Sequence, residues 1–339
     1  MNHTCLLLFC FLSVELSAAD LAAAVHSASV PQAFNGATGN RYPIWTGDSL
    51  VSLTPASTGT SDRKAVTAIV YDRNGKQIAS PSIWVEGAAR VFTNRLAVNS
   101  ENRVMAGGHA VSTNGKMIGF LMIADLTGKP QTVIATTPYV PEAVCFGSDG
   151  GIWTLLSLID MDGSGRSTDY KMLRHYSASN GALISEALSR SRFSTDLPPA
   201  VEAGPGQEVM MDCNKGGVGI YFGHASVWIE VTNGGTITEY PFPRKVLDGS
   251  GLAGTRQIAD GIALLDSGSL YANFSNASQT GLYRLDKQGS RWIAVPGTAG
   301  SRDKAVLARL HGKDSSGMLV FSSSLPGRST NDLYFGAIE

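Results

Sequence analysis

Five acidic or imidazole side chains stand where they could do chemistry together: Glu142, Glu208, Asp260, His109 and His224. Carboxylates at bonding distance can hold a divalent cation, and a histidine that titrates near neutral pH can move a proton. A bound metal ion would hold a substrate oxygen while a histidine or carboxylate moves the proton. Such a set would serve a metal-assisted lyase or lactonase.

The two histidines occupy equivalent places in a repeated pattern. His109 lies in GGHAV and His224 in FGHAS, each seven residues beyond a predicted turn. We place both in loops after the second strand of a repeat, at similar heights on one face. The alternative is that the repeats reuse a similar residue at a strand end, where the ring packs and hydrogen-bonds locally.

A second candidate metal site lies in the segment DMDGSG, residues 160–165. Asp160, Asp162 and Ser164 match the oxygen ligands at positions one, three and five of an EF-hand-type calcium loop. Position twelve is Lys171, where that loop requires a bidentate glutamate. The segment is therefore either a polar hairpin tip or a weak Ca²⁺ site. No other cofactor site is predicted.

Two cysteines, Cys145 and Cys213, lie outside the N-terminal apolar segment that holds Cys5 and Cys10. Both precede a predicted turn near the end of an innermost strand, in neighbouring repeats. In an oxidising compartment they could form a disulfide, and otherwise they are two buried thiols that pack as small hydrophobic side chains. No CxxC spacing supports a structural zinc site.

Residues 1–19 predict a cleavable export signal. An apolar core from Cys5 to Val14 is followed by Ser17, Ala18 and Ala19, although the first four residues carry no Lys or Arg. No later segment approaches the ~20 apolar residues that span a bilayer. We expect a secreted or periplasmic protein, with residues 20–339 forming one domain and acting as a monomer.

The composition narrows the function classes. The 339 residues are 43% hydrophobic and 16% charged, with 38 glycines and a net charge of −1. A turn-rich globular chain without a charged run is a poor partner for nucleic acid or an acidic membrane surface. No Gly-x-Ser-x-Gly elbow, His-Glu-x-x-His helix, phosphate loop or dinucleotide fingerprint is present, which disfavours common hydrolase, zincin and nucleotide chemistries.

The elements that would position these residues are short strands in a repeating unit. Residues 261–289 predict three strands joined by turns at Ser267-Gly268 and Gln288-Gly289, and the chain continues into a fourth strand at Trp292. The second turn recurs in four earlier units, with its glycines 53, 53, 53 and 55 residues apart: Gly75, Gly128, Gly181, Gly234 and Gly289. The first turn occurs six times in all.

Six first turns predict an all-β, six-bladed β-propeller with four-stranded antiparallel blades. The sixth blade stops at its third strand, residues 333–338. An open blade edge would expose unpaired backbone groups. We therefore predict that Val25 to Phe34 pairs with this strand and closes the ring.

The strings GIALLDSGSLYANF, AVCFGSDGGIWTLL and LAVNSENRVMAGG resemble the strand-turn-strand repeat of NHL-type, streptogramin-lyase-like and SMP-30-like six-bladed propellers. This resemblance implies a propeller without fixing its function. Asp260-Gly261 resembles the Asp-Gly opening that carries a catalytic aspartate in the gluconolactonase-like group, but that group's Glu-Gly-Pro in blade one is missing. A turn or strand-start residue is the other interpretation of Asp260.

In such blades, the loops after the second and fourth strands open on one face. Glu142, Glu208 and Asp260 fall near that face, and the long links 188–207 and 243–255 border it. Our leading hypothesis is an exported binding or scaffold protein that holds a small ligand or a protein partner at this mouth. The lyase or lactonase is the alternative.

Overall fold

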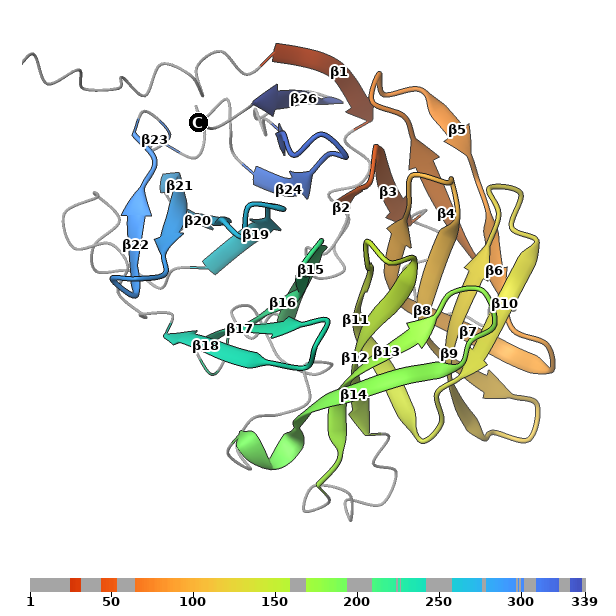
Figure 1. The fold of residues 1–339 in the computed structure, drawn as a ribbon. Coiled ribbons are helices and arrows are strands. Elements are labelled where there is room, and N and C mark those ends of the chain that lie inside the picture. The colour runs from red at the N-terminus through yellow and green to blue at the C-terminus, as the bar shows by residue number, and fades with distance from the viewer. Residues whose placement is uncertain are drawn as a thin grey trace, which may run out of the picture.

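A computed structural model describes residues 25–31, 44–53, 65–158, 169–193, 209–223, 225, 227–241, 258–275, 279–296, 298, 300–301, 309–322 and 330–336. This part of the chain is nearly all β, and its one helical element is the 3₁₀ turn η4 (Arg190–Arg192). Six antiparallel sheets stand around a centre as the blades of a propeller (Figure 1). The six-bladed fold predicted from the turns is confirmed.

Each blade begins with a strand at the centre of the ring. In chain order these innermost strands are β2 (Ile44–Thr46), β7 (Ala88–Val98), β11 (Tyr139–Phe146), β15 (Val209–Asn214), β19 (Ile258–Leu264) and β24 (Arg309–Lys313). Innermost strands of neighbouring blades contact one another around most of the ring, so residues far apart in sequence meet at the centre.

The second strand of each blade pairs with the innermost strand, and the third and fourth strands follow outward. The second strands are β3 (Ser49–Leu53), β8 (Val104–Ser112), β12 (Gly151–Leu158), β16 (Gly217–Phe222), β20 (Leu270–Ser275) and β25 (Leu319–Ser322). The third strands are β4 (Ala65–Tyr71), β9 (Met117–Ala124), β13 (Lys171–Ser177), β17 (Val227–Thr232), β21 (Gln279–Asp286) and β26 (Thr330–Gly336).

The outer strands of blades one to five come from the same blade's own segment. They are β5 (Gln77–Ala79) with β6 (Ser82–Trp84), β10 (Pro130–Ala135), β14 (Leu183–Ser189), β18 (Ile237–Pro241), and β22 (Arg291–Ala294) with β23 (Gly300–Ser301). In blades one and five the two outer pieces pair with different parts of the same third strand.

The outer strand of blade six is β1 (Val25–Pro31), which pairs antiparallel with β26 from Val25↔Phe335 to Pro31↔Thr330. This confirms the predicted closure of the ring by the N-terminal segment. The predicted strand extended to Phe34, and the residues after Pro31 lie outside the described part. The pairing covers an edge of β26 that would otherwise expose unpaired backbone groups.

Left-handed residues at the turns explain why the pattern could be found in the sequence. The first turns have positive φ at Gly47, Asn102, Gly150, Gly217, Gly268 and Gly317. Among the second turns, Gly75, Gly128 and Gly181 have the positive φ that we expected, but the fourth and fifth turns place it at Gly235 and Ser290 instead of Gly234 and Gly289. The spacing was correct, and the residue assignment in those two turns was wrong by one position.

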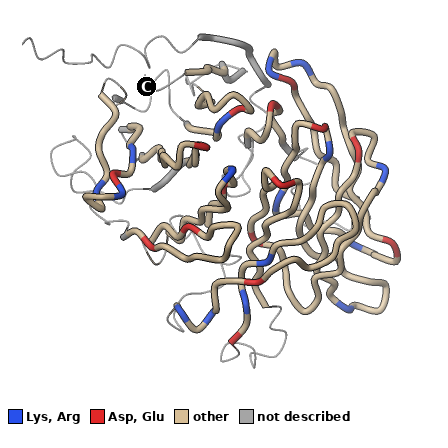
Figure 2. The backbone as a smooth tube through the Cα atoms, viewed as in Figure 1, with Lys and Arg blue, Asp and Glu red and all other residues tan. Residues whose placement is uncertain are grey.

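The core consists of layers of apolar side chains between neighbouring blades. One layer joins blades one and two through residues such as Val70, Ile83, Phe120 and Met122, and others surround Trp153 and Trp228, which are almost fully buried. Burial at about 25 cal/mol per Å² of apolar surface is the main force that holds blade on blade. Basic and acidic residues are interspersed along the described chain in the view of Figure 2.

Candidate functional site

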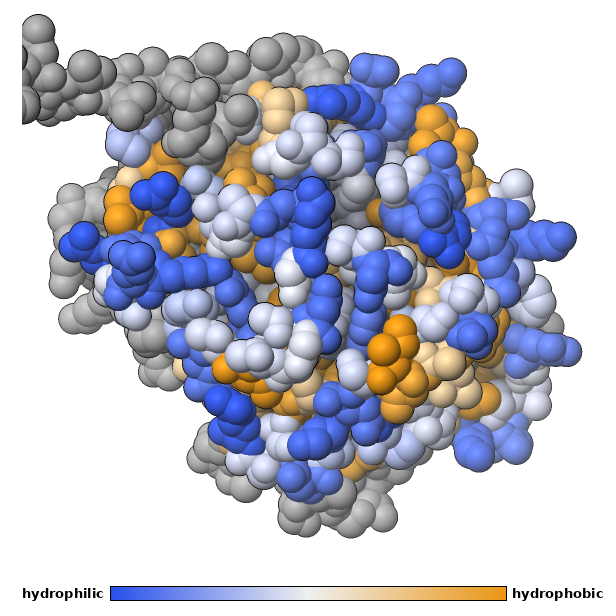
Figure 3. All heavy atoms as spheres, viewed as in Figure 1, coloured by the Kyte–Doolittle hydropathy of each residue, from blue (hydrophilic) through white to orange (hydrophobic). Residues whose placement is uncertain are grey.

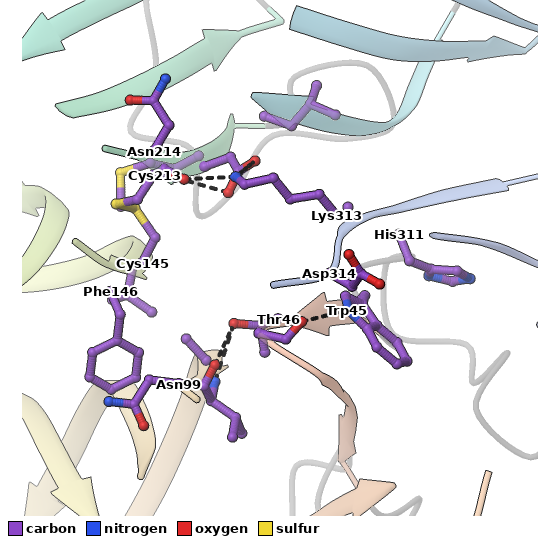
Figure 4. A pocket seen from close by; sticks show the side chains of 18 of the residues that line it. Trp45, Thr46, Asn99, Cys145, Phe146, Cys213, Asn214, His311, Lys313 and Asp314 are labelled. Carbon is purple, nitrogen blue, oxygen red and sulfur yellow. Dashed lines mark hydrogen bonds and ion pairs between the residues drawn. A yellow bond between two sulfur atoms is a disulfide. The ribbon is translucent and has the colours of Figure 1, made fainter. Parts of the chain in front are cut away.

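A cavity of about 410 Å³ lies in the central channel, lined by residues of all six innermost strands and by the turns that follow them. It therefore lies toward the ends of these strands, on the side of the first turns. We had expected the site at the other end, where the innermost strands begin. Figure 4 shows side chains from several blades around this space, among them Trp45, Phe146 and Lys313.

The walls of the cavity are largely apolar and rich in sulfur. They include aliphatic and aromatic side chains from all six blades: Trp45, Leu96, Val144, Phe146, Met210, Met211, Ile262 and Leu310. Cys145 and Cys213 also line it, and they form a disulfide with their Cα atoms 5.8 Å apart. Of the two alternatives left open for these cysteines, the structure has the disulfide, which joins the innermost strands of blades three and four.

An ion pair crosses the channel from blade six to blade four. Lys313 Nζ lies 2.8 Å from Asp212 Oδ2 and donates a second hydrogen bond to the carbonyl oxygen of Cys213 at 2.7 Å. The same carboxylate accepts from the backbone N–H of Leu264 in blade five at 2.8 Å and, through Oδ1, from that of Cys213 at 2.9 Å. Asp212 thus connects three blades, and each of its oxygens has a donor.

The other two carboxylates that line the cavity are engaged in the same way. Asp266 lies 3.0 Å from Lys215 Nζ and accepts from the Lys215 backbone N–H. Burial alone would raise the pKa of Asp266, but the hydrogen bonds and charge of Lys215 bring that pKa below its ordinary value. Asp314 accepts three hydrogen bonds within its own turn and faces Arg73 at 3.2 Å.

Hydrogen bonds between neighbouring first turns fix the rim of the cavity. Thr46 Oγ1 donates to the Val98 carbonyl oxygen at 2.9 Å, which links blades one and two. Asp48 accepts from Ser315 across the joint between blades one and six. Asn214 Nδ2 donates to the Leu265 carbonyl oxygen between blades four and five. The cavity therefore has a rigid, hydrogen-bonded rim.

Glu142, a predicted site residue, is buried in β11 and does not line this cavity. Its Oε1 accepts a hydrogen bond from Ser157 Oγ at 2.6 Å. Tyr170 lies nearby, with its hydroxyl accepting from the Leu158 backbone N–H, and burial, to which the charge of Glu142 adds, raises the pKa of the Tyr170 hydroxyl. This hydrogen bond joins the innermost strand β11 to the second strand β12, and a catalytic role of Glu142 stays a prediction.

His109 lies inside strand β8 and not in the loop where we had placed it, so that expectation is wrong. Blade two has a further tight turn, with Gly115 at positive φ, that joins β8 directly to β9. The His109 ring stacks on Phe92 with centroids 4.8 Å apart, and burial lowers the pKa of the imidazole. This arrangement agrees with the local packing that we gave as the alternative.

The remaining predicted site residues stay untested. Glu208, His224, Asp160, Asp162 and Ser164 lie outside the described residues, and Asp260 is described only through its backbone in β19. Within the described residues, no three or more His, Cys, Asp or Glu side chains are grouped to hold a metal ion. The predicted Ca²⁺ site and the metal-assisted lyase or lactonase therefore stay predictions.

Sequence reasoning missed Asp212 and Lys313, although a signal for them exists. Counting back four residues from the first-turn glycines Gly217, Gly268 and Gly317 reaches Cys213, Leu264 and Lys313. These three residues meet around Asp212 in the structure. Aligning the repeats on their first turns would have placed them in one layer of the channel.

Comparison of the sequence with protein-family models and with curated proteins finds no match. Among solved structures, the fold is similar to a DUF4221 family member from Bacteroides vulgatus, with 9% identity, a TM-score of 0.53, and 92% of this chain and 96% of the other covered. It is also similar to a candidate exported protein from Bacteroides fragilis, with 10% identity, a TM-score of 0.52, and 92% and 94% covered.

A streptogramin B lyase structure also matches, with 12% identity, a TM-score of 0.41, and 91% of this chain and 97% of the other covered. At identities of 9% and 10%, the two likenesses with TM-scores above 0.5 concern the fold alone. Within the described residues, no helix has the length and apolar character that a membrane crossing requires.

Proposed function

We propose that this chain is an exported β-propeller that binds a small molecule in its central cavity and does not transform it. The observation that carries this proposal is the cavity itself, which all six blades line and whose walls are mostly apolar. Ligand sites are typically concave, apolar clefts of roughly 300–1,000 Å³ with a few placed polar groups. At about 410 Å³, the cavity falls inside that range.

The carboxylates around the cavity favour binding over catalysis. General acid–base chemistry needs a group that can exchange its proton with a substrate. The imidazole of His311, which also lines the cavity, shares a 2.7 Å hydrogen bond with Ser322 Oγ. The lining carboxylates Asp212, Asp266 and Asp314 each have a cationic partner and backbone donors. Their role is to hold strands and turns in place, which supports a preformed receptor.

Two further observations support export. The N-terminal apolar segment is followed by small residues, as in a cleavable signal. The Cys145–Cys213 disulfide is of a kind that persists in oxidising compartments such as the periplasm or the extracellular space.

The size of the cavity favours a small molecule over a protein partner. A volume of about 410 Å³ at the centre of a ring can hold a small molecule, whereas a protein partner would need a larger surface.

The test is a thermal-shift panel of small uncharged, anionic and cationic molecules against residues 20–339. A molecule that binds the folded state raises the melting temperature with its concentration. We expect at least one class to stabilise the protein and to lose its effect in Met210→Trp, which fills the cavity. Met117→Trp, on the outer part of blade two and away from the cavity, is the matched control.

Stabilisation that is equal in the two Trp variants would place binding elsewhere and contradict the proposal. The same holds if no class stabilises the protein.

A further inference from the structure

We infer that the molecule held in the cavity is uncharged, with an apolar body and one hydrogen-bond acceptor directed at Lys313. This inference rests on the proposed binding function and names its ligand class. Three observations carry it: the composition of the walls, the ion pairs that the lining carboxylates already form, and the hydrogen bonds that Lys313 already makes.

The walls specify an apolar body. Trp45 and Phe146 are contributed by blades one and three. Met210 and Met211 are consecutive residues of β15 that pack on opposite sides of blade four, and both line the cavity. Methionine side chains and a disulfide are polarisable and adapt to flat aromatic or branched aliphatic groups. Each Å² of apolar ligand surface that is buried against such walls contributes about 25 cal/mol to the binding free energy.

The charges around the cavity disfavour a cationic ligand. Three carboxylates line it, those of Asp212, Asp266 and Asp314, and their partners are Lys313, Lys215 and Arg73. Each carboxylate already lies within 3.2 Å of a Lys or Arg nitrogen. A cation would have to displace one of these partners, and an ion that enters unpaired bears the full cost of leaving water.

Lys313 supplies the place for a neutral acceptor. Its ammonium group has three N–H donors, and two of them are directed to Asp212 Oδ2 and the Cys213 carbonyl oxygen. Among the described residues the third donor has no partner, and the side chain reaches across the channel toward Cys213 (Figure 4). A carboxylate or phosphate at this donor would lie beside the Asp212 carboxylate and be repelled, whereas a carbonyl, ether or hydroxyl oxygen would not.

Three fluorescent probes separate charge from hydrogen bonding. N-Phenyl-1-naphthylamine is uncharged, 1-anilinonaphthalene-8-sulfonate adds a sulfonate to the same scaffold, and Prodan is an uncharged naphthyl ketone. We expect the phenylnaphthylamine to bind at least tenfold more tightly than the sulfonate, a difference of at least about 1.4 kcal/mol. Met210→Trp should weaken both uncharged probes by a similar factor, and Met117→Trp should leave their affinities within about twofold.

The double variant Lys313→Met/Asp212→Asn tests the acceptor. It removes the donor and the opposing charge together, while the amide that replaces the carboxylate retains an oxygen for the Leu264 N–H. We expect Prodan to lose about fivefold in affinity, the value of one net hydrogen bond, and the phenylnaphthylamine to change by less than about twofold. Circular dichroism and the melting temperature establish that each variant is folded, and Met210→Phe replaces Met210→Trp if the latter does not fold.

The outcomes distinguish the two levels of the proposal. If the sulfonate binds as tightly as its uncharged counterpart and is displaced by Met210→Trp, the cavity is a ligand site but the ligand class is wrong. If Prodan and the phenylnaphthylamine respond equally to the double variant, the role of Lys313 is wrong. If no probe binds, or if Met210→Trp and Met117→Trp bind alike, both the ligand class and the proposed function are overturned.

Discussion

Two links hold this ring together, one at its outer edge and one at its centre. At the outer edge, β1 adds seven residues to blade six by pairing along the strand β26. At the centre, one covalent bond between Cys145 and Cys213 ties blade three to blade four. The outer link completes a sheet, and the inner link fixes the wall of a cavity. Stability and binding should therefore depend on different links.

The physical basis of the two links also differs. The β1–β26 pairing stabilises the folded state by satisfying a sheet edge that would otherwise face water or another chain. The disulfide acts mainly on the unfolded state, by closing a loop across a sequence separation of 68 residues. Removing the first leaves a blade incomplete, whereas removing the second leaves every strand in place.

Removal of β1 should have the largest effect. We expect a protein that begins at Gln32 to lose about 6 kcal/mol of unfolding free energy relative to one that begins at Asp20, since six paired positions contribute about 1 kcal/mol each. Urea denaturation measures the loss, and a peptide of residues 25–31 added in trans should restore part of it as its concentration rises. Equal stability of the two proteins would show that the outer link is dispensable.

Loss of the disulfide should come second. Cys145→Ala/Cys213→Ala should lower the unfolding free energy by about 4 kcal/mol at most, the chain-entropy value for a loop of this length. The same measurement on the wild type with reductant is the control, and it should give a similar loss. A larger loss than that from removing β1 would reverse the order of the two links.

The ion pair across the channel should be worth less than either link. Lys313→Met leaves the Asp212 carboxylate partly buried without its cation, and we expect a loss of about 2 kcal/mol. The double variant Lys313→Met/Asp212→Asn should recover much of that loss, because the unpaired charge is gone. A double-mutant cycle by urea denaturation measures the coupling free energy between Lys313 and Asp212. A coupling free energy of zero would show that this ion pair does not stabilise the folded protein.

The smallest effect should come from His109, which lies in blade two away from both links. Burial lowers the pKa of the imidazole in the folded protein below its ordinary 6.5. The unfolded chain then binds the proton more readily, so the contribution of His109 is fully present above pH 6.5 and is lost as the pH falls below it.

His109→Gln should therefore flatten the fall in melting temperature between neutral and mildly acidic pH. Parallel curves for wild type and variant would mean that other groups govern the acid sensitivity. Either result leaves unchanged which of the two links contributes more to stability. His109→Gln can therefore serve as a control variant for the variants that affect the links.

The blades could be predicted because their signals are local. A tight turn needs positive φ within a few residues of sequence, and glycine or asparagine at Gly75, Asn102 or Gly317 provides it. The role of β1 followed from a general argument about open sheet edges and not from any property of its own residues. Neither the turn signal nor the argument from open sheet edges requires the distance between residues that are far apart in the sequence.

The error in placing His109 arose because blade two departs from the repeat. Blade two contains a third tight turn at Gly115, so β8 and β9 form a long hairpin and His109 falls within a strand. Asn114-Gly115 is as clear a turn signal as the others, but it lies outside the pattern of two turns per repeat. The repeat length alone does not show that the connection between the second and third strands of blade two is a tight turn.

The cavity could not be predicted because it depends on the geometry of the whole ring. Asp212 and Lys313 lie 101 residues apart in sequence and meet because blade six lies near blade four across the channel. No local pattern contains that distance. Figure 3 shows hydrophilic and hydrophobic residues mixed over the face that it views, so the hydropathy of this face does not mark the apolar cavity.

The pairing of β1 with β26 also sets an order of events during biosynthesis. Val25–Pro31 leaves the ribosome before any blade exists, and its partner Thr330–Gly336 follows after nearly all the other strands. The first segment made must remain without its partner strand until almost the entire polypeptide is available. Ring closure is therefore a post-translational step, and a chain interrupted at any earlier point lacks one of the two strands that seal it.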